Sequence, residues 1–234
     1  MSKNDMIDSS HVNRGQRPDY LGKEAFVFMN DSLQYYNQHA KEFSDSTRDV
    51  EFKEMQERFL VYLKPGARIL DFGCGSGRDT KYFLDRGFET DAADGSEELV
   101  RIASEYTGIE VRLMYFQDLD EKEAYDGIWA CSSILHLAYR ELEDVFIKMA
   151  RALTSHGILY TSFKYGTAEG ERNGRYFTDM TEEKMDKLLK DVNLFWHIGN
   201  VGNEWCPSGE SRRKMAEHDI EEKIESLRQI QKEI

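Results

Sequence analysis

Three glycines alternate with other residues in the segment 71–77, which reads DFGCGSG. Glycine has no Cβ atom, so this spacing lets the backbone turn sharply and leaves no side chain between the loop and a ligand. A helix that begins directly after such a loop offers unpaired N–H groups to an anionic group. Asp71, just before the loop, can accept hydrogen bonds from an ammonium group. The segment therefore predicts a loop that binds the amino-acid end of a ligand; the alternative is an ordinary strand-to-helix turn.

A second carboxylate stands at the end of the next predicted strand. Asp94 lies 23 positions after Asp71, and Gly95 follows it. A carboxylate at this place can accept hydrogen bonds from both hydroxyls of an adenosine ribose. Ser96 is suited to cap the helix that follows. Asp91 is the competing acid, but its alternation along the strand is typical of a solvated side chain, so Asp94 is the preferred candidate.

A third polar group follows the third predicted strand. Asp118 can accept a hydrogen bond from an adenine amino group, with Gln117 or Leu119 against the ring. The alternative is an acidic loop, because Asp120 and two glutamates come directly afterwards.

A nicotinamide-binding domain shares the first two of these features. Its fingerprint needs a further glycine three positions after Gly75, and Arg78 occupies that position. The large side chain would obstruct the close approach of a pyrophosphate. The spacing therefore favours a ligand without a pyrophosphate.

The elements that must position these residues alternate between strand and helix. Apolar residues at helical spacing predict two helical pieces within residues 23–63, ended by Lys64-Pro65-Gly66. Beyond them we expect strands at 67–72, 88–93, 111–116, 125–131 and 158–163, with a sixth near 194–198. Between the strands we expect a short helix that ends near residue 87 and further helices at 96–106, 142–153 and 185–192. This order predicts a parallel, doubly wound sheet that binds its ligand at the carboxyl ends of the strands.

Composition limits the class of protein. The 234 residues carry 44 acidic and 31 basic side chains, a net charge of −13 that disfavours nucleic acid as a partner. No apolar run approaches the roughly 20 residues needed to span a bilayer, and the polar first 20 residues do not resemble a signal peptide, so we expect a cytoplasmic protein. The three cysteines have no metal-ligand spacing, so we predict free thiols and no metal site.

The chain resembles the class I S-adenosylmethionine (SAM)-dependent methyltransferases between about residues 35 and 178, and among them the small bacterial tellurite-resistance-like ones. The matching stretches are 69–77, 93–99, 116–119 and 126–136. They are specific for SAM, with S-adenosylhomocysteine (SAH) as product, and carry little information about the methyl acceptor.

The resemblance implies a contact set for the cofactor. The loop would hold the methionine end, Asp94 and Gly95 the ribose, and residues 117–119 the adenine. The end of the fourth strand would lie near the sulfonium, and a tyrosine of an amino-terminal cap would close over the ligand. The implied residues are Tyr35, Tyr36, Asp71, Gly73, Cys74, Gly75, Asp94, Gly95, Gln117, Asp118, Leu119, Ala130, Cys131 and Ser132.

Other side chains are candidates for the acceptor side. His136 can face the methyl-transfer site and act as a base, with Tyr36 as a second catalytic candidate; a packed structural histidine is the alternative. Arg172 and Arg175 lie in a segment, 164–178, that we read as a loop after the fifth strand. They could clamp a carboxylate or phosphate, or equally form surface ion pairs.

These observations predict a Rossmann-like α/β fold with a mainly parallel sheet of six to seven strands. We expect a flexible leader (1–22), a helical cap (23–64), the SAM-binding domain (65–205) and a carboxyl-terminal helical extension (206–234). The predicted function is methyl transfer to a small, anionic acceptor by a monomer or homodimer without membrane contact. The alternatives are an RNA or protein methyltransferase and a non-catalytic SAM-binding subunit.

Overall fold

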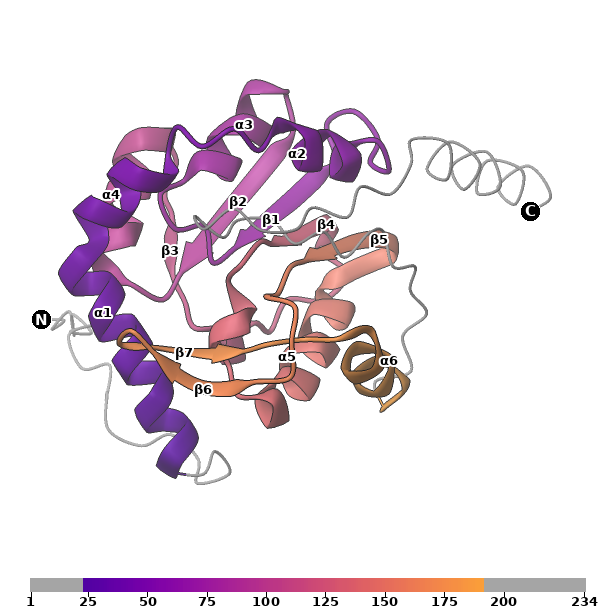
Figure 1. Cartoon of the computed structure of the whole chain (residues 1–234). Coiled ribbons are helices and arrows are strands. Elements are labelled where there is room, and N and C mark those ends of the chain that lie inside the picture. Colours follow the sequence, from indigo (N-terminus) through magenta and orange to yellow (C-terminus); the bar gives the residue numbers. More distant parts are fainter. Residues whose placement is uncertain (1–22, 192–234) are drawn as a thin grey trace, which may run out of the picture. The chain divides into compact units, whose positions relative to one another are not determined.

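A computed structural model describes residues 23–191 of the chain, with side chains from residue 31 onward (Figure 1). The predicted leader, the sixth strand expected near residues 194–198 and the carboxyl-terminal extension lie outside the described residues.

The central sheet confirms the predicted fold class. Its strands are β1 (Arg68–Phe72), β2 (Glu89–Asp94), β3 (Arg112–Leu113), β4 (Tyr125–Ala130) and β5 (Leu153–Thr161). They pair in the order β3-β2-β1-β4-β5, and every pair is parallel. The chain thus reverses its winding direction between β1 and β4, which places a binding crevice at the carboxyl ends of these strands. Within the described residues this sheet has five strands, compared with the six to seven expected for the whole sheet.

Helices cover both faces of the sheet because β1 alternates its side chains between them. Ile69 packs with Phe59 of α2 (Lys53–Leu60) and Phe83 of α3 (Arg78–Asp85). Leu70 and Phe72 point to the other face and join the core beside α5 (Tyr139–Ala152) and α6 (Glu182–Asp191).

The third strand is much shorter than the predicted 111–116. Only Arg112 and Leu113 pair with β2, opposite Ala93 and Asp94, where β2 itself ends. The chain then forms a 3-10 turn, η1 (Phe116–Asp118). This turn brings the predicted adenine-side residues to the same edge of the sheet as the glycine loop.

The segment 164–178, which we expected to be a loop, contains an antiparallel hairpin. β6 (Glu169–Arg172) and β7 (Arg175–Thr178) are joined by Asn173 and Gly174, whose φ angles are 53° and 75°. Two successive positive φ angles define the hairpin turn that an Asn-Gly pair favours. The hairpin could have been predicted from this Asn-Gly pair, which our interpretation of the sequence overlooked.

The first helix, α1 (Lys23–Thr47), is longer than the predicted amino-terminal piece and bends at His39, which has non-helical angles of φ −114° and ψ 16°. It packs against α4 (Glu97–Thr107) and β7, so it runs past the edge of the sheet beside the hairpin (Figure 1). Among the helices within residues 23–191, none combines the length and apolarity that crossing a bilayer requires.

Candidate active site

The glycine loop and the end of β2 are joined by hydrogen bonds to one carboxylate. The Gly75 N–H donates to Oδ2 of Asp94, and the Ser96 N–H donates to its Oδ1, both at 2.9 Å. Burial raises the pKa of the Asp94 carboxyl, and these two N–H donors oppose the rise. Ser96 caps α4 as predicted, since its hydroxyl accepts a hydrogen bond from the Leu99 N–H.

The loop lies close against its surroundings at Gly73. The N–H groups of Gly73 and Cys74 both donate to the Ala93 carbonyl, at 2.8 and 3.0 Å. Gly73 has a φ of 84°, and a Cβ atom there would lie 2.4 Å from the Cβ of Ser133. Ser133 in turn donates to the Phe72 carbonyl at 2.7 Å, which joins the ends of β1 and β4. Only glycine fits this position.

Asp71 lies beneath the loop and is only 2% exposed. It accepts a 2.5 Å hydrogen bond from the Thr80 hydroxyl of α3. Burial, and then the neighbouring Asp79, raise the pKa of Asp71 to about 8. Asp79 accepts hydrogen bonds from Gln56, Arg78 and the Trp129 indole, among others. Asp71 thus has a protein partner in this structure, and its predicted contact with an ammonium group remains a prediction.

The competing acid of β2 has a structural partner. Asp91 forms a 2.7 Å ion pair with Arg68 of the adjacent strand β1. This arrangement agrees with the interpretation of Asp91 as a side chain outside the ligand site.

The segment predicted to bind adenine contains an unsatisfied acceptor. Gln117 donates to Glu141 at 3.4 Å, while its Oε1 is buried and has no hydrogen-bond partner in the described part of the chain. Leu119 is fully buried and Asp118 is exposed. A buried, unpaired carbonyl oxygen is costly unless a ligand donor reaches it.

Helix α1 covers the loop directly. A Cβ atom at Gly75 would lie 3.1 Å from the ring of Phe43, and one at Gly95 would lie 2.7 Å from Leu33. Asn37 holds the helix on α4, since its Oδ1 accepts hydrogen bonds from the Ser96 hydroxyl at 2.7 Å and the Glu98 N–H at 3.3 Å. The side chains of α1 therefore occupy the space directly above the two glycines.

Three candidate residues from distant segments meet beside the loop. The Tyr36 hydroxyl lies 2.9 Å from Nε2 of His136 and 3.4 Å from Nη1 of Arg175. Nδ1 of His136 lies 2.6 Å from the Tyr176 carbonyl. The guanidinium carbon of Arg175 is 4.6 Å from the centre of the Tyr35 ring. Tyr35 and Tyr36 thus contact the acceptor-side candidates, and their predicted contact with the cofactor remains untested.

The two candidate arginines have different surroundings. Arg172 forms a two-pronged ion pair with Asp179, with distances of 3.0 and 2.5 Å. Arg175 forms no ion pair in the part of the chain that the structure describes, and its Nε is buried without a partner. Lys164, Arg172 and Arg175 all lie over the ring of Phe177, at 4.2, 4.8 and 5.2 Å. Three cations thus gather around one ring in a protein whose net charge is −13.

The remaining candidates, Ala130, Cys131 and Ser132, lie at the end of β4. Ala130 is fully buried, and burial raises the pKa of Cys131 to about 12, so both are chemically inert here. Ser132 is exposed and has a φ of 50°, which is uncommon for a residue with a side chain. Its N–H donates to the Ser162 hydroxyl at 2.8 Å. Strained backbone of this kind often marks a functional turn.

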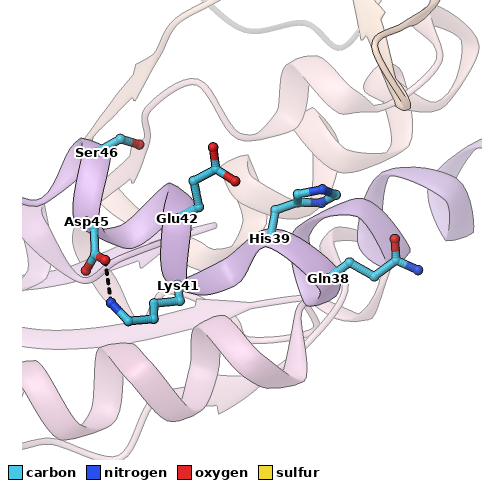
Figure 2. A pocket seen from close by; sticks show the side chains of 6 residues that line it. All are labelled: Gln38, His39, Lys41, Glu42, Asp45 and Ser46. Carbon is cyan, nitrogen blue, oxygen red and sulfur yellow. Dashed lines mark hydrogen bonds and ion pairs between the residues drawn. The ribbon is translucent and has the colours of Figure 1, made fainter.

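An open hollow of about 640 Å³ lies elsewhere, along the bend of α1. Figure 2 shows its six lining residues (Gln38, His39, Lys41, Glu42, Asp45 and Ser46), all from α1, with Lys41 and Asp45 in an ion pair. None of these residues belongs to the glycine loop or to a strand end. The hollow is therefore separate from the candidate active site.

Comparison with known proteins agrees with this geometry. Residues 69–157 match a family described as a methyltransferase domain. A methyltransferase of Staphylococcus carnosus is 26% identical over 181 residues, which are 68% of this chain and 87% of that one.

Solved structures share the fold. One is the 1,6-didemethyltoxoflavin-N1-methyltransferase of Burkholderia thailandensis, solved with SAH (TM-score 0.61, 19% identity, 82% of this chain and 88% of that one). Another is a TehB-like SAM-dependent methyltransferase of Corynebacterium glutamicum (TM-score 0.51, 20% identity, 68% and 82%).

Residues 69–157 form a class I methyltransferase domain. The predicted enzyme class and the predicted cofactor, SAM, are thereby confirmed.

Sequence reasoning missed several residues that shape the site of this methyltransferase: Leu33, Asn37, Phe43, Ser133 and Lys164. Phe43 follows Tyr36 by seven positions, which is two helical turns, so the face of α1 that carries both could have been predicted. No comparable sequence pattern predicts the close approach of Ser133 to Gly73.

Proposed function

We propose that this methyltransferase transfers the methyl group of SAM to a small anionic molecule held between α1 and the β6–β7 hairpin. The observation that carries the proposal is Arg175, a half-buried cation without an ion pair in the described residues, enclosed by aromatic side chains of both elements. An enclosed site of this kind suits a small acceptor better than a folded RNA or protein. The didemethyltoxoflavin enzyme, which shares the fold, also acts on a small molecule.

The residues present fit the cofactor. Asp94 would hold the ribose hydroxyls, the N–H groups of the glycine loop would hold the methionine end, and Oε1 of Gln117 would accept a hydrogen bond from the adenine amino group. When bound, SAM supplies an electrophilic methyl group. The chain positions the acceptor and excludes water from the site, which can provide most of the rate acceleration.

Loading this site requires α1 to move. Phe43 and Leu33 lie against the two glycines that the cofactor would approach. We therefore assign α1 the role of a lid that opens for SAM and closes over it, as such lids commonly do.

The experiment that tests the function incubates the protein with a cell extract and SAM that carries a radioactive methyl group. Dialysis then separates the small molecules from the RNA and protein. We expect the label in the small-molecule fraction and none above background in the RNA or protein fractions. Label confined to RNA or protein would contradict the proposed acceptor class.

Once an acceptor is identified, Arg175→Ala should raise its KM about tenfold or more and leave SAH affinity nearly unchanged, because a charge-assisted contact to the acceptor is lost. Arg140→Ala, on the exposed surface of α5, is the matched control and should leave both values unchanged. An unchanged KM in Arg175→Ala would remove this arginine from the acceptor site.

A further inference from the structure

The hydroxyl oxygen of Tyr36 lies between a histidine and an arginine in the proposed acceptor site. The Tyr36 hydroxyl has Nε2 of His136 on one side, at 2.9 Å, and Nη1 of Arg175 on the other, at 3.4 Å. These three groups come from α1, from the turn after β4 and from the first residue of β7. The two partners converge on a single point from elements far apart in the sequence.

The hydrogen-bond partners fix the roles of the histidine nitrogens. Nδ1 lies 2.6 Å from the Tyr176 carbonyl, which can only accept, so Nδ1 carries the proton. Nε2 then presents a lone pair, and the Tyr36 hydroxyl donates to it. Burial lowers the pKa of His136 to about 4, and the nearby cations Arg175, Lys164 and Arg172 add to this effect. The ring is therefore neutral at neutral pH, with the lone pair of Nε2 directed at the hydroxyl.

The guanidinium on the other side is unneutralised. Arg172 has its charge paired by Asp179, whereas Arg175 contacts only a hydroxyl and aromatic rings in the part of the chain that is described. A buried cation without a counter-ion is costly to maintain and attracts a negative charge. The hydroxyl of Tyr36 satisfies Arg175 only weakly, because it is neutral and 3.4 Å away.

We propose that the Tyr36 hydroxyl occupies the place of the acceptor's own hydroxyl, and that the acceptor is a phenol or enol whose oxygen is methylated. This proposal rests on the proposed function. In it, His136 takes the proton of the acceptor hydroxyl and Arg175 stabilises the resulting negative charge on oxygen. The Tyr36 side chain leaves this place when the acceptor enters.

The reaction balances as a substitution at carbon. The O–H bond of the acceptor breaks, and its proton moves to Nε2 of His136. A lone pair of the oxygen forms the bond to the methyl carbon while the carbon–sulfur bond breaks and its electron pair stays on sulfur. A neutral hydroxyl compound, a neutral imidazole and a sulfonium give an ether, a thioether and an imidazolium, so the total charge is unchanged. The imidazolium then releases its proton to water.

The charges around the site favour oxygen over an amine nitrogen as the acceptor atom. An amine gains positive charge as it is methylated, and here that charge would form beside Arg175, whose own charge has no counter-ion among the described residues. A hydroxyl that loses its proton instead places negative charge beside the same cation. Such preorganised charges are a principal source of transition-state stabilisation.

The test measures the binding of two small probes to the full-length protein saturated with SAH. The probes are 4-nitrophenol and 4-nitroanisole, which differ only in whether the oxygen carries a hydrogen or a methyl group. We expect the wild type to bind 4-nitrophenol about tenfold more tightly, since only its oxygen can donate to Nε2 or, once ionised, pair with Arg175. Equal affinities, or no binding of 4-nitrophenol, would overturn the proposal.

Three variants sharpen the result. Tyr36→Phe removes the competing hydroxyl and should bind 4-nitrophenol several-fold more tightly than the wild type, whereas weaker binding would show that Tyr36 assists the acceptor and would overturn the proposal. Arg175→Gln should abolish the preference for 4-nitrophenol, and Arg140→Gln should keep it. A preference that survives Arg175→Gln would also overturn the proposal.

The same titrations separate this proposal from the proposed function. SAH binding and methyl transfer to a small molecule report on the proposed function alone. A protein that binds SAH and methylates an amine, with no preference between the two probes, would keep the proposed function and overturn the oxygen site.

Discussion

The Gly75 amide and the Asp94 carboxylate are joined by a 2.9 Å hydrogen bond, although 19 residues separate them in the sequence. This bond fixes the glycine loop relative to the end of β2 before any ligand arrives. The same carboxylate is the one proposed to hold the ribose. Preorganisation of this kind lowers the entropic cost of binding.

Asp94→Ala should weaken SAH binding by about 30- to 150-fold, or about 2–3 kcal/mol, because a charge-assisted contact to the ribose is lost. Isothermal calorimetry measures the change. Asp91→Ala is the matched control, since Asp91 lies on the same strand and pairs with Arg68. Unchanged affinity in a folded Asp94→Ala protein would exclude this residue from the site.

Gly73→Ala should reduce the free energy of unfolding by about 2–4 kcal/mol and impair SAH binding. About 1 kcal/mol comes from the positive φ and the rest from overpacking against Ser133. Gly87→Ala is a sharp control, because Gly87 has nearly the same φ (81°) but no atom within 4 Å of an added Cβ. Denaturant unfolding of both variants measures the difference. Equal losses would mean that the contact with Ser133 contributes nothing.

Hydrogen exchange in residues 31–47 of α1 should change when SAH binds, because Phe43 and Leu33 must leave Gly75 and Gly95 for the cofactor to enter. Mass spectrometry of the free and SAH-bound protein measures this. Helix α5, which packs in the core with Leu70 and Phe72, serves as the internal control. Identical exchange of α1 in the two states would refute its role as a lid.

The stability of the protein should contain a pH-dependent contribution from Asp71. Burial and Asp79 raise its pKa to about 8, so the folded state binds more protons than the unfolded chain between about pH 4 and pH 8. The free energy of unfolding therefore falls as pH rises through this window, by at most about 1.4 kcal/mol for each pH unit.

Asp71→Asn removes this contribution, so the variant should gain stability relative to the wild type as pH increases from 5 to 8. Urea unfolding at several pH values measures the difference between the two proteins. Thr80, which donates to Asp71, can also donate to the Asn oxygen, so the variant keeps that contact. A difference that does not vary with pH would show that Asp71 titrates normally.

The local contacts of the proposed donor half could be predicted from sequence because they lie within one strand-loop-helix unit. Asp94 was identified by its place at a strand end, and Ser96 by its place before a helix. Both depend on contacts within one strand-loop-helix unit. The shortness of β3 was missed for the opposite reason, since strand pairing depends on a partner that local pattern does not specify. The hairpin was missed although its Asn-Gly turn is a local feature.

The acceptor half combines residues that no local pattern connects. Tyr36 lies 100 positions from His136 and 139 positions from Arg175, and the carboxylate that pairs with Arg172 comes from the end of the hairpin. The sequence offered the two arginines as equivalent. The packed structure shows that they differ, because Asp179 neutralises one and aromatic rings surround the other.

The close approach of Ser133 to Gly73 has a consequence for how such an enzyme diversifies. The two residues join the ends of β1 and β4, so a change at either position disturbs the donor half as a whole. The acceptor-side groups of α1 and the hairpin contact each other, and Tyr36 and Arg175 belong to these two elements. We therefore expect substrate preference to change most readily through Tyr36 and the 164–180 segment together, while Leu33, Asn37 and Phe43 of α1 keep their contacts with the donor half.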